Sequence, residues 1–335
     1  MSASATDAAL PVIAVDAMGG DSAPDEIVAG AVLAHRDRLG RIVLVGDRAR
    51  LEPLLHGQAG IEIVHSAGQV PMDASASQAV RKSGGTSLGD AVDLVREGRA
   101  AAVVSAGNSG AFLAIALIRL RTIPGVARPA IGAVLPGKHG PVVLCDAGAN
   151  VDCRPEWLMQ FGVMGAAYAR AGLGVADPRV GIVSVGEERT KGNTQSMEAA
   201  ALLERAPVRF IGNVEGKDIL QDVADVVVAD GFVGNVILKT AEGSATYFRD
   251  VMREAYEGAG PIGKLGALFS RSVFADIRVR LDYSTYGGAP LLGVRGNCIV
   301  AHGRSDRTAI RNAIRQAAAV AGADLVGSIG AAIAA

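Results

Sequence analysis

The sequence predicts an α/β fold with a doubly wound, mostly parallel sheet. Short runs rich in Val, Ile and Leu alternate with helical patterns along most of the 335 residues, as expected of parallel strands that are covered on both faces. Glycine is abundant, at 43 residues, and stands at the ends of the apolar runs, where a chain needs tight turns between strand and helix.

The expected elements follow from these patterns. Ten strands are predicted: Val12–Asp16, Arg41–Val45, Ile61–His65, Ala101–Ser105, Ala130–Leu135, Val142–Asp146, Arg179–Val185, Val208–Ile211, Asp225–Asp230 and Cys298–His302. Helices are predicted in the gaps: Pro24–His35, Ser87–Glu97, Asn108–Arg121, Pro155–Ala171, Thr194–Arg205 and Ser305–Ala321. Pro24 and Pro155 stand at helix starts, where a preset φ and a missing N–H cost nothing.

Composition and charge narrow the class of protein. The net charge of −1 gives no broad electrostatic surface for nucleic acid. Three irregularly spaced cysteines suit a reducing cytoplasm. The first residues lack the basic and apolar regions of a signal peptide. The longest apolar run, Ala111 to Ile118, is short of the about 20 residues that cross a membrane. We expect a cytoplasmic enzyme.

Residues 11–325 are expected to form a single α/β unit, with flexible termini at 1–10 and 326–335. Residues 243–281 lack a strand pattern and are expected to form a helical hairpin inserted in that unit, turning near Ala259-Gly260-Pro261. Its second arm has a local excess of basic residues and an apolar spacing. Packing in a dimer is one interpretation, and contact with anionic lipid or an acidic partner is another. The residues assigned to such contacts are Lys264, Leu268, Phe269 and Arg271.

Gly-rich loops with Asp, Asn or Ser follow several predicted strands. Parallel α/β sheets bind ligands at the carboxyl ends of strands, and free N–H groups at helix starts bind anions there. No GxGxxG or Walker pattern is present. The candidate anion-binding residues are Asp16, Gly19, Gly20, Asp21, Ser105, Gly107, Ser109, Gly148, Glu187, Asp230, Gly231, Gly234 and Asn235.

Lys191 is the best candidate for a cation that neutralises a phosphate. It lies in a loop with Gly192 and Asn193, between a predicted strand and a predicted helix. No GxSxG elbow or convincing Ser/His/Asp set is present. His302 and His65 end strands, which favours structural or supporting roles over a general base; His302 is kept among the candidate substrate-binding residues.

Several sequence blocks resemble the PlsX family, the phosphate acyltransferases of bacterial phospholipid synthesis. These blocks run in order from about Val12 to Ala321: AVDAMGGD, SAGNSGA, DAGANVDCRPE, EERTKGN, FIGNVEGKDI, ADVVVADGFVGNVILKT, DYSTYGGAPLLG and AHGRSD. The resemblance implies reversible transfer of a fatty acyl group from acyl-(acyl-carrier-protein) to orthophosphate. It also implies a fold like that of isopropylmalate dehydrogenase and phosphotransacetylase.

The resemblance assigns roles residue by residue. Lys191 corresponds to the family's lysine in the KGN block, and Asn108 and Asn150 lie in its AGN and GAN loops; these three are the predicted catalytic residues. Asn213 lies in the FIGNVEGKDI block and is assigned to the substrate site. Two residues depart from the pattern: Ser22 stands where His is common, and Ser109 stands where Thr is usual.

The resemblance further implies a homodimer that works with acyl carrier protein, inorganic phosphate and the membrane acyltransferase PlsY. It implies no cofactor, no metal and no nucleic acid, and a cytoplasmic location with peripheral attachment to the inner face of the membrane. The chemistry is consistent, since a thioester has a good leaving group and phosphate is already anionic near neutral pH. Holding and desolvating the phosphate is then the main task of the site.

Three alternatives remain open. The protein could be a phosphotransacetylase-like enzyme that uses acyl-CoA. It could be an NAD-dependent β-decarboxylating dehydrogenase of the same fold, with Asp222, Asp225 and Asp230 as metal ligands. It could also be a scaffold without activity, which would not need so many Gly and Asn loops.

Overall fold

The computed structural model describes residues 10–260, 263, 266, 268–272 and 286–335. The chain divides into two compact units, Met1–Gly125 with Gly287–Gly330, and Val126–Tyr286 with Ala331–Ala335. The chain leaves the first unit at Gly125 and re-enters it at Gly287. Gly125 and Gly287 both have positive φ, at 87° and 92°. The single unit expected over residues 11–325 therefore corresponds to two compact units.

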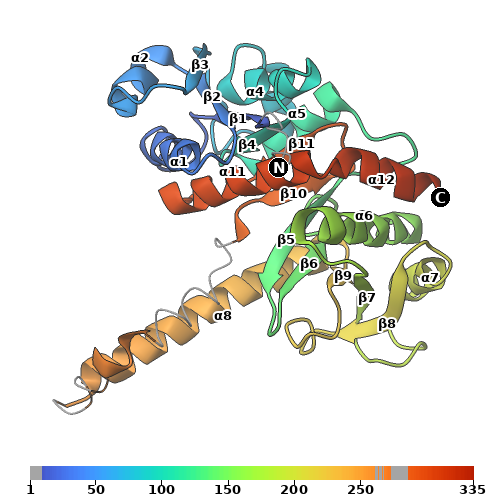
Figure 1. Ribbon diagram of the computed structural model, residues 1–335. Helices are drawn as coiled ribbons and strands as arrows, with labels where there is room; N and C mark the ends of the chain where they lie inside the picture. The colour runs from blue at the N-terminus through green and yellow to red at the C-terminus, as the bar shows by residue number, and fades with distance from the viewer. Residues whose placement is uncertain (1–9, 261–262, 264–265, 267, 273–285) are drawn as a thin grey trace, which may run out of the picture. The chain divides into compact units, whose positions relative to one another are not determined.

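Unit 1, the N-terminal unit, has a sheet in the order β3-β2-β1-β4-β11-β10 (Figure 1). Its pairs are parallel except for β10 with β11. The strands are β1 (Val12–Asp16), β2 (Arg41–Gly46), β3 (Glu62–His65), β4 (Ala102–Ser105), β10 (Ala289–Leu292) and β11 (Asn297–Val300). The helices are α1 (Asp25–Arg36), α2 (Arg48–Leu51), η1 (Glu52–Leu55), α3 (Ala76–Arg81), α4 (Ser87–Arg96), α5 (Ser109–Leu120), α11 (Arg307–Gly322) and α12 (Leu325–Ala334).

Helices cover the central strands of unit 1 completely. Every residue of β4 is buried, as are Ile13 to Asp16 of β1. The helices α1 and α11 pack together against these strands, and α4 and α5 form a second pair. A strand buried on both faces reads as a continuous apolar run, which explains why β1 and β4 were recognised in the sequence.

Unit 2, the C-terminal unit, has a sheet in the order β5-β6-β9-β7-β8. Only β5 and β6 are antiparallel. The strands are β5 (Ala130–Pro136), β6 (Pro141–Cys145), β7 (Arg179–Ser184), β8 (Arg209–Glu215) and β9 (Val226–Val228). The helices are α6 (Pro155–Leu173), α7 (Thr194–Leu203) and α8 (Gly231–Gly258). The mostly parallel, doubly wound class predicted from sequence is confirmed.

The long helix α8 begins on the sheet of unit 2 and continues beyond it (Figure 1). Its 28 residues span about 42 Å at 1.5 Å per residue, more than the length of any strand. Near its start, Val233, Ile237, Leu238 and Ala241 pack on a core of buried strand and loop residues. The Gly-rich loop expected at residues 230–235 is wrong, because Asp230 caps a helix that runs without interruption from Gly231 to Gly258.

Two other expectations differ from the structure. Strand β10 was not predicted, because Ala289–Leu292 is short, contains Pro290 and is defined mainly by its pairing with β11. Residues 326–335, expected to be flexible, lie in α12 as far as Ala334, with Leu325 and Ile329 buried. Residues 1–9 lie outside the described part of the chain.

No single helix among the described residues has the length and apolar character needed to cross a membrane. The bent pair α11 and α12 meets that test, by length and composition alone.

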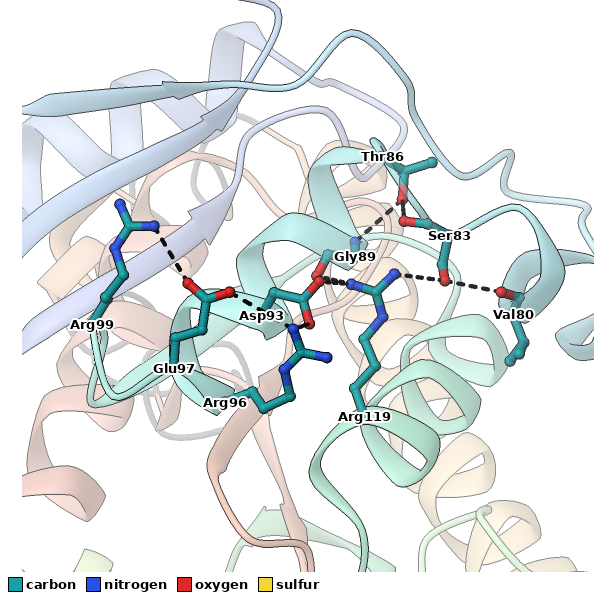
Figure 2. A network of polar contacts seen from close by, with 9 residues as sticks. All are labelled: Val80, Ser83, Thr86, Gly89, Asp93, Arg96, Glu97, Arg99 and Arg119. Carbon is teal, nitrogen blue, oxygen red and sulfur yellow. Dashed lines mark hydrogen bonds and ion pairs between the residues drawn. The ribbon is translucent and has the colours of Figure 1, made fainter.

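Arg119 of α5 joins three segments of unit 1 in one polar network (Figure 2). Its guanidinium donates to the Gly89 carbonyl at 2.8 Å and to Ser83 Oγ at 2.8 Å, and it pairs with Asp93. Thr86 Oγ1 donates to the Ser83 carbonyl at 2.8 Å and accepts from Gly89 N, which caps α4. The network thereby fixes α5 against α4 and the turn before it.

Candidate active site

Three loops of unit 1 meet at the carboxyl ends of β1, β4 and β11. Register pairs Val15 with Val104 and Val300 with Ser105, so the loops that follow are neighbours. Asp21 N donates to the Gly303 carbonyl at 2.8 Å, which brings His302 beside the first loop. The structure thus brings together the predicted unit 1 residues Asp16, Gly19, Gly20, Asp21, Ser105, Gly107, Asn108, Ser109 and His302.

Asp16 organises these loops from beneath. Its carboxylate is 2% exposed and accepts from Ser105 Oγ at 2.7 Å, and Ser105 Oγ accepts in turn from Gly107 N at 3.0 Å. Burial raises the pKa of Asp16, while its hydrogen bonds oppose that rise. Gly19 must lack a side chain, because a Cβ there would overlap the Asp16 carboxylate and approach Gly107 N to 2.9 Å. The geometry is that of a positioning residue, and phosphate contact by Asp16 stays a prediction.

Asn108 uses its whole side chain within unit 1. Its Nδ2 donates to the carbonyls of Met72 at 2.7 Å and Ala74 at 3.0 Å, and its Oδ1 accepts from Ala111 N to cap α5. Both amide hydrogens are therefore engaged, and the segment before α3 is tied to the start of α5. The catalytic assignment of Asn108 stays a prediction. The exposed hydroxyl of its neighbour Ser109 has no partner among the described residues.

In unit 2, Asp146 holds the loop that follows its strand by accepting hydrogen bonds, as Asp16 does in unit 1. Sequence reasoning did not select Asp146 as a site residue. The carboxylate is fully buried at the end of β6. Its Oδ1 accepts from the N–H groups of Ile131 (2.9 Å), Gly148 (3.2 Å) and Ala149 (3.0 Å). Its Oδ2 accepts from Asn150 N at 2.7 Å and Asn150 Nδ2 at 2.9 Å. Burial raises its pKa, and these hydrogen bonds oppose the rise.

The start of α8 packs tightly on the turn that Asp146 holds. Gly231 N donates to the Asn150 carbonyl at 2.7 Å, and a Cβ on Gly234 would overlap the Asp146 carbonyl oxygen. Asp230 caps the helix by accepting from Val233 N at 2.8 Å. Asn150 Nδ2 also donates to the Pro129 carbonyl at 2.8 Å, so neither of its amide hydrogens is free. Its catalytic assignment likewise stays a prediction.

Lys191 lies in a loop that the structure holds firmly although its side chain is exposed. Asn213 Nδ2 donates to the carbonyls of Gly186 (3.2 Å), Glu188 (2.8 Å) and Lys191 (3.3 Å). Ser184 Oγ donates to the Lys191 carbonyl at 3.1 Å. Within the described chain the Lys191 ammonium has no acidic partner. A fixed backbone therefore presents a free cation.

The loop of Lys191 leads into α7, which connects it to the Asp146 turn. Asn193 caps α7 by accepting from Ser196 N at 2.8 Å, and Gly192 adopts a φ of 123° that a side chain would disfavour. Gln195 Nε2 donates to the Cys153 carbonyl at 2.5 Å. The predicted residues of unit 2 thus gather at the carboxyl edge of its sheet: Gly148, Asn150, Glu187, Lys191, Gly192, Asn193, Asn213, Asp230, Gly231, Gly234 and Asn235.

The predicted side chains divide into two groups by their contacts. Asp16, Ser105, Asn108, Asn150, Asn193, Asn213 and Asp230 are engaged in holding loops. In the described chain, Ser109 of unit 1 and, in unit 2, Lys191 and Asn235 have exposed donor groups with no hydrogen-bond partner; the Asn235 side chain lies beside Gly148, where a Cβ would approach it to 3.5 Å. Lys191 and Asn235 are thus the free donors of the unit 2 cluster, together with backbone N–H groups in the first turns of α7 and α8.

Two arginines flank the only tryptophan beside the Asn150 turn, and sequence reasoning did not select them. The guanidinium of Arg128 lies 4.9 Å from the centre of the Trp157 ring, and that of Arg154 lies 5.7 Å from it. Both distances are typical of cation–π contacts. Neither arginine has an acidic partner among the described residues. Arg128 precedes Pro129, whose carbonyl binds Asn150, so this basic aromatic surface adjoins the candidate site.

Other candidate groups are accounted for by structural contacts. His302 Nδ1 accepts from Arg304 N at 3.1 Å, which agrees with a supporting role. Asp222 and Asp225 both pair with Arg179, at 2.9 and 3.0 Å, and Asp230 caps α8; this argues against the metal set of a dehydrogenase. Burial raises the pKa of the Cys153 thiol to about 11, so it is not a thiolate at neutral pH.

The predicted hairpin is described only in part. Leu268 and Phe269 are 64% and 79% exposed, and Arg271 is exposed beside them. Lys264, with Pro261 and most of the predicted second arm, lies outside the described residues.

The fold and the site define an α/β enzyme with glycine-rich loops at the carboxyl ends of its strands and a lysine that has no acidic partner among the described residues. The family model described as "Fatty acid synthesis protein" matches residues 12–327. A phosphate acyltransferase of Desulforudis audaxviator is 47% identical over 317 residues, covering 95% of this chain and 94% of that protein. A phosphate acyltransferase of Pelotomaculum thermopropionicum is 48% identical over 308 residues, covering 91% and 90%.

A solved phosphotransacetylase from Streptococcus pyogenes has the same fold, with a TM-score of 0.64, 17% identity and coverage of 93% of this chain and 94% of that one. The chain belongs to the family described as fatty acid synthesis proteins. The relatives that resemble it most of those compared above are phosphate acyltransferases. The resemblance seen in the sequence blocks and the enzyme class are confirmed.

Proposed function

We propose that this enzyme transfers a fatty acyl group from acyl-(acyl-carrier-protein) to orthophosphate, giving an acyl-phosphate for phospholipid synthesis. A phosphate oxygen forms a bond to the thioester carbonyl carbon and the C–S bond breaks. The carrier leaves as a thiolate, which takes up the phosphate proton through water. The observation that carries the proposal is the free ammonium of Lys191 on a loop held by Asn213 and Ser184.

The arrangement suits a reaction that needs positioning more than base catalysis. Phosphate is already an anion, so no histidine base is required. A fixed cation and N–H groups at helix starts bind its charge and stabilise the developing oxyanion. Asp16 and Asp146 keep the loops in shape without a metal or cofactor taking part in the proposed step.

The donor is tested by comparing thioesters of the same acyl chain. Palmitoyl-(acyl-carrier-protein) and palmitoyl-CoA are each mixed with enzyme and phosphate, and free thiol is followed. We expect a higher kcat/KM with the carrier protein. A preference for palmitoyl-CoA favours the phosphotransacetylase-like alternative, and thiol release that does not depend on phosphate contradicts the proposal.

We propose that the surface formed by Arg128, Trp157 and Arg154 receives the acidic carrier protein. Two guanidinium groups lie against one aromatic ring and have no acidic partner in the described part of the chain, so they offer a positive surface next to the Asn150 turn. Charges at the edge of an interface mainly affect association and its salt dependence.

Replacing both arginines, Arg128→Glu with Arg154→Glu, is expected to lower kcat/KM for the carrier-protein donor about tenfold at low salt, because two attractions become repulsions. The loss shrinks at high salt through screening. Activity with a neutral S-acyl-pantetheine stays within about twofold. Arg205→Glu, at another exposed arginine of unit 2, serves as control. Equal losses with both donors would show that the arginines do not bind the carrier protein.

We also propose that the enzyme is a peripheral membrane protein of the cytoplasm that acts as a homodimer and passes its product to PlsY. Its contact with the membrane includes Leu268, Phe269 and Arg271; Lys264, which lies outside the described residues, is assigned to the same hairpin from sequence. Two large exposed apolar side chains beside a cation match an interfacial segment.

Changing Leu268→Asp together with Phe269→Asp should release the enzyme from anionic phospholipid vesicles. Burying these two side chains contributes about 3–5 kcal/mol, so the constant for binding to the vesicles should fall by a factor of about 100 or more. The measurement is co-sedimentation with vesicles. Ile118→Asp, at an exposed apolar residue of α5, is the control. Undiminished binding of the double variant would place the contact elsewhere.

A further inference from the structure

An apolar hollow of about 600 Å³ lies beside α8 in unit 2. Its volume is in the range of small-molecule sites, about 300–1,000 Å³. Its walls come from the end of β5, the loop after β8 and one side of α8. The lining residues include Leu135, Ile219, Leu220, Val236, Ala245 and Phe248.

The hollow forms where α8 extends beyond the sheet, because the helix has small side chains on the side that faces the loop after β8. Ile237, Leu238 and Ala241 still pack on the core, together with Leu135 and Ile219. One turn further along α8, the side chains of Ser244 and Ala245 are too small to fill the space beside the loop. Phe248, 53% exposed, closes the far end. The one charged lining residue among those described, Glu242, is neutralised by Lys239 at 2.8 Å.

The hollow and the unit 2 part of the candidate site are both formed in part by α8. Gly231 and Gly234 of this helix touch the Asn150 and Asp146 turns, and Val236 begins the lining two residues later. From Val236 to Phe248 the helix rises about 18 Å at 1.5 Å per residue. A carbon chain with bonds of about 1.5 Å at tetrahedral angles advances ~1.25 Å per carbon, so about 14 carbons cover the same length.

We propose that this hollow binds the hydrocarbon chain of the acyl donor, with the thioester at the start of α8 and the tail directed toward Phe248. The inference rests on the proposed function for the identity of the chain. A long, uncharged occupant fits because every unpaired lining group is apolar, small or a hydroxyl. The hollow would then set the preferred chain length, with Ala245 as the residue that leaves room for the distal carbons.

The test fills the hollow and compares donors of different length. The readout is the ratio of kcat/KM for palmitoyl- over butyryl-(acyl-carrier-protein), measured with phosphate. Each buried methylene changes affinity about fourfold. Ala245→Phe displaces several methylenes and should lower the ratio roughly 100-fold, and the milder Ala245→Leu should lower it about tenfold. Thr246→Phe adds a ring on the next, exposed residue outside the lining and should leave the ratio within twofold.

An unchanged ratio in both Ala245 variants overturns the inference. The inference is also overturned if light scattering shows that the Ala245 variants differ from the wild type in molar mass while the ratio is unchanged. That result would mean that a second copy of the protein covers this face of α8. Titration of the enzyme with palmitate separates this inference from the proposed function. If the wild type shows no transfer to phosphate, the proposed function fails, yet palmitate binding lost in Ala245→Phe still supports the hollow. Equal palmitate binding by the wild type and Ala245→Phe overturns the inference.

Discussion

Lys191→Ala should lower kcat/KM for acyl transfer to phosphate by about 10²–10³ while leaving the fold intact. The loss corresponds to about 3–4 kcal/mol, the amount typical of removing one group that stabilises a developing oxyanion. Stability should change by less than about 0.5 kcal/mol, because the side chain is exposed and has no partner among the described residues. The measurements are steady-state kinetics and a thermal melt.

Lys138→Ala is the matched control, since Lys138 is an exposed lysine of the same unit. It should keep wild-type kinetics. The dependence on phosphate concentration shows how Lys191 acts. A higher KM for phosphate alone means that the ammonium binds ground-state phosphate, and a lower kcat means that it acts in the transition state. Wild-type values of both parameters in Lys191→Ala would remove Lys191 from the site.

Asp146→Asn should destabilise unit 2 and abolish most of the activity. Five N–H donors converge on the two carboxylate oxygens, and an amide would turn two hydrogens toward at least two of them. Each buried donor left unpaired costs about 1–3 kcal/mol, so the free energy of unfolding should fall by about 3–5 kcal/mol. For a unit of this size the melting temperature would drop by roughly 6–20 °C.

Asp152→Asn makes the same chemical change on an exposed carboxylate of the same segment and should melt with the wild type. Activity of Asp146→Asn is measured well below its melting point, so that loss of the turn is separated from loss of the fold. A variant that melts like the wild type would contradict the organising role given to Asp146.

Much of the fold could be predicted because its signals are local. β1 was predicted at its observed bounds, since a buried parallel strand is a plain apolar run ended by a turn. α6 begins at Pro155 as expected. β10 and the start of α8 could not be predicted in the same way. β10 depends on pairing with β11, which lies later in the chain. The start of α8 depends on the Asp230 cap, and the Gly-rich sequence after Asp230 is more typical of a loop.

The site was predictable as a set of loops but not as a set of roles. The sequence singled out Asn108 and Asn150, yet their amide groups bind the carbonyls of Met72 and Pro129, which lie far away in sequence. The same limit concealed Asp146, whose donors include Ile131, and the pairing of Arg128 with Trp157. Lys191 was selected because its loop is local and because the KGN block resembles a known family, and its role in the site stays a prediction.

The central claim is that phosphate is the acyl acceptor. Phosphorus NMR of a mixture of enzyme, palmitoyl-(acyl-carrier-protein) and orthophosphate tests it most directly. The proposal predicts a new acyl-phosphate signal that grows in proportion to the free thiol released, and that is nearly absent with Lys191→Ala. Thiol release with free palmitate as the product and no new phosphorus signal would show that water, not phosphate, is the acceptor.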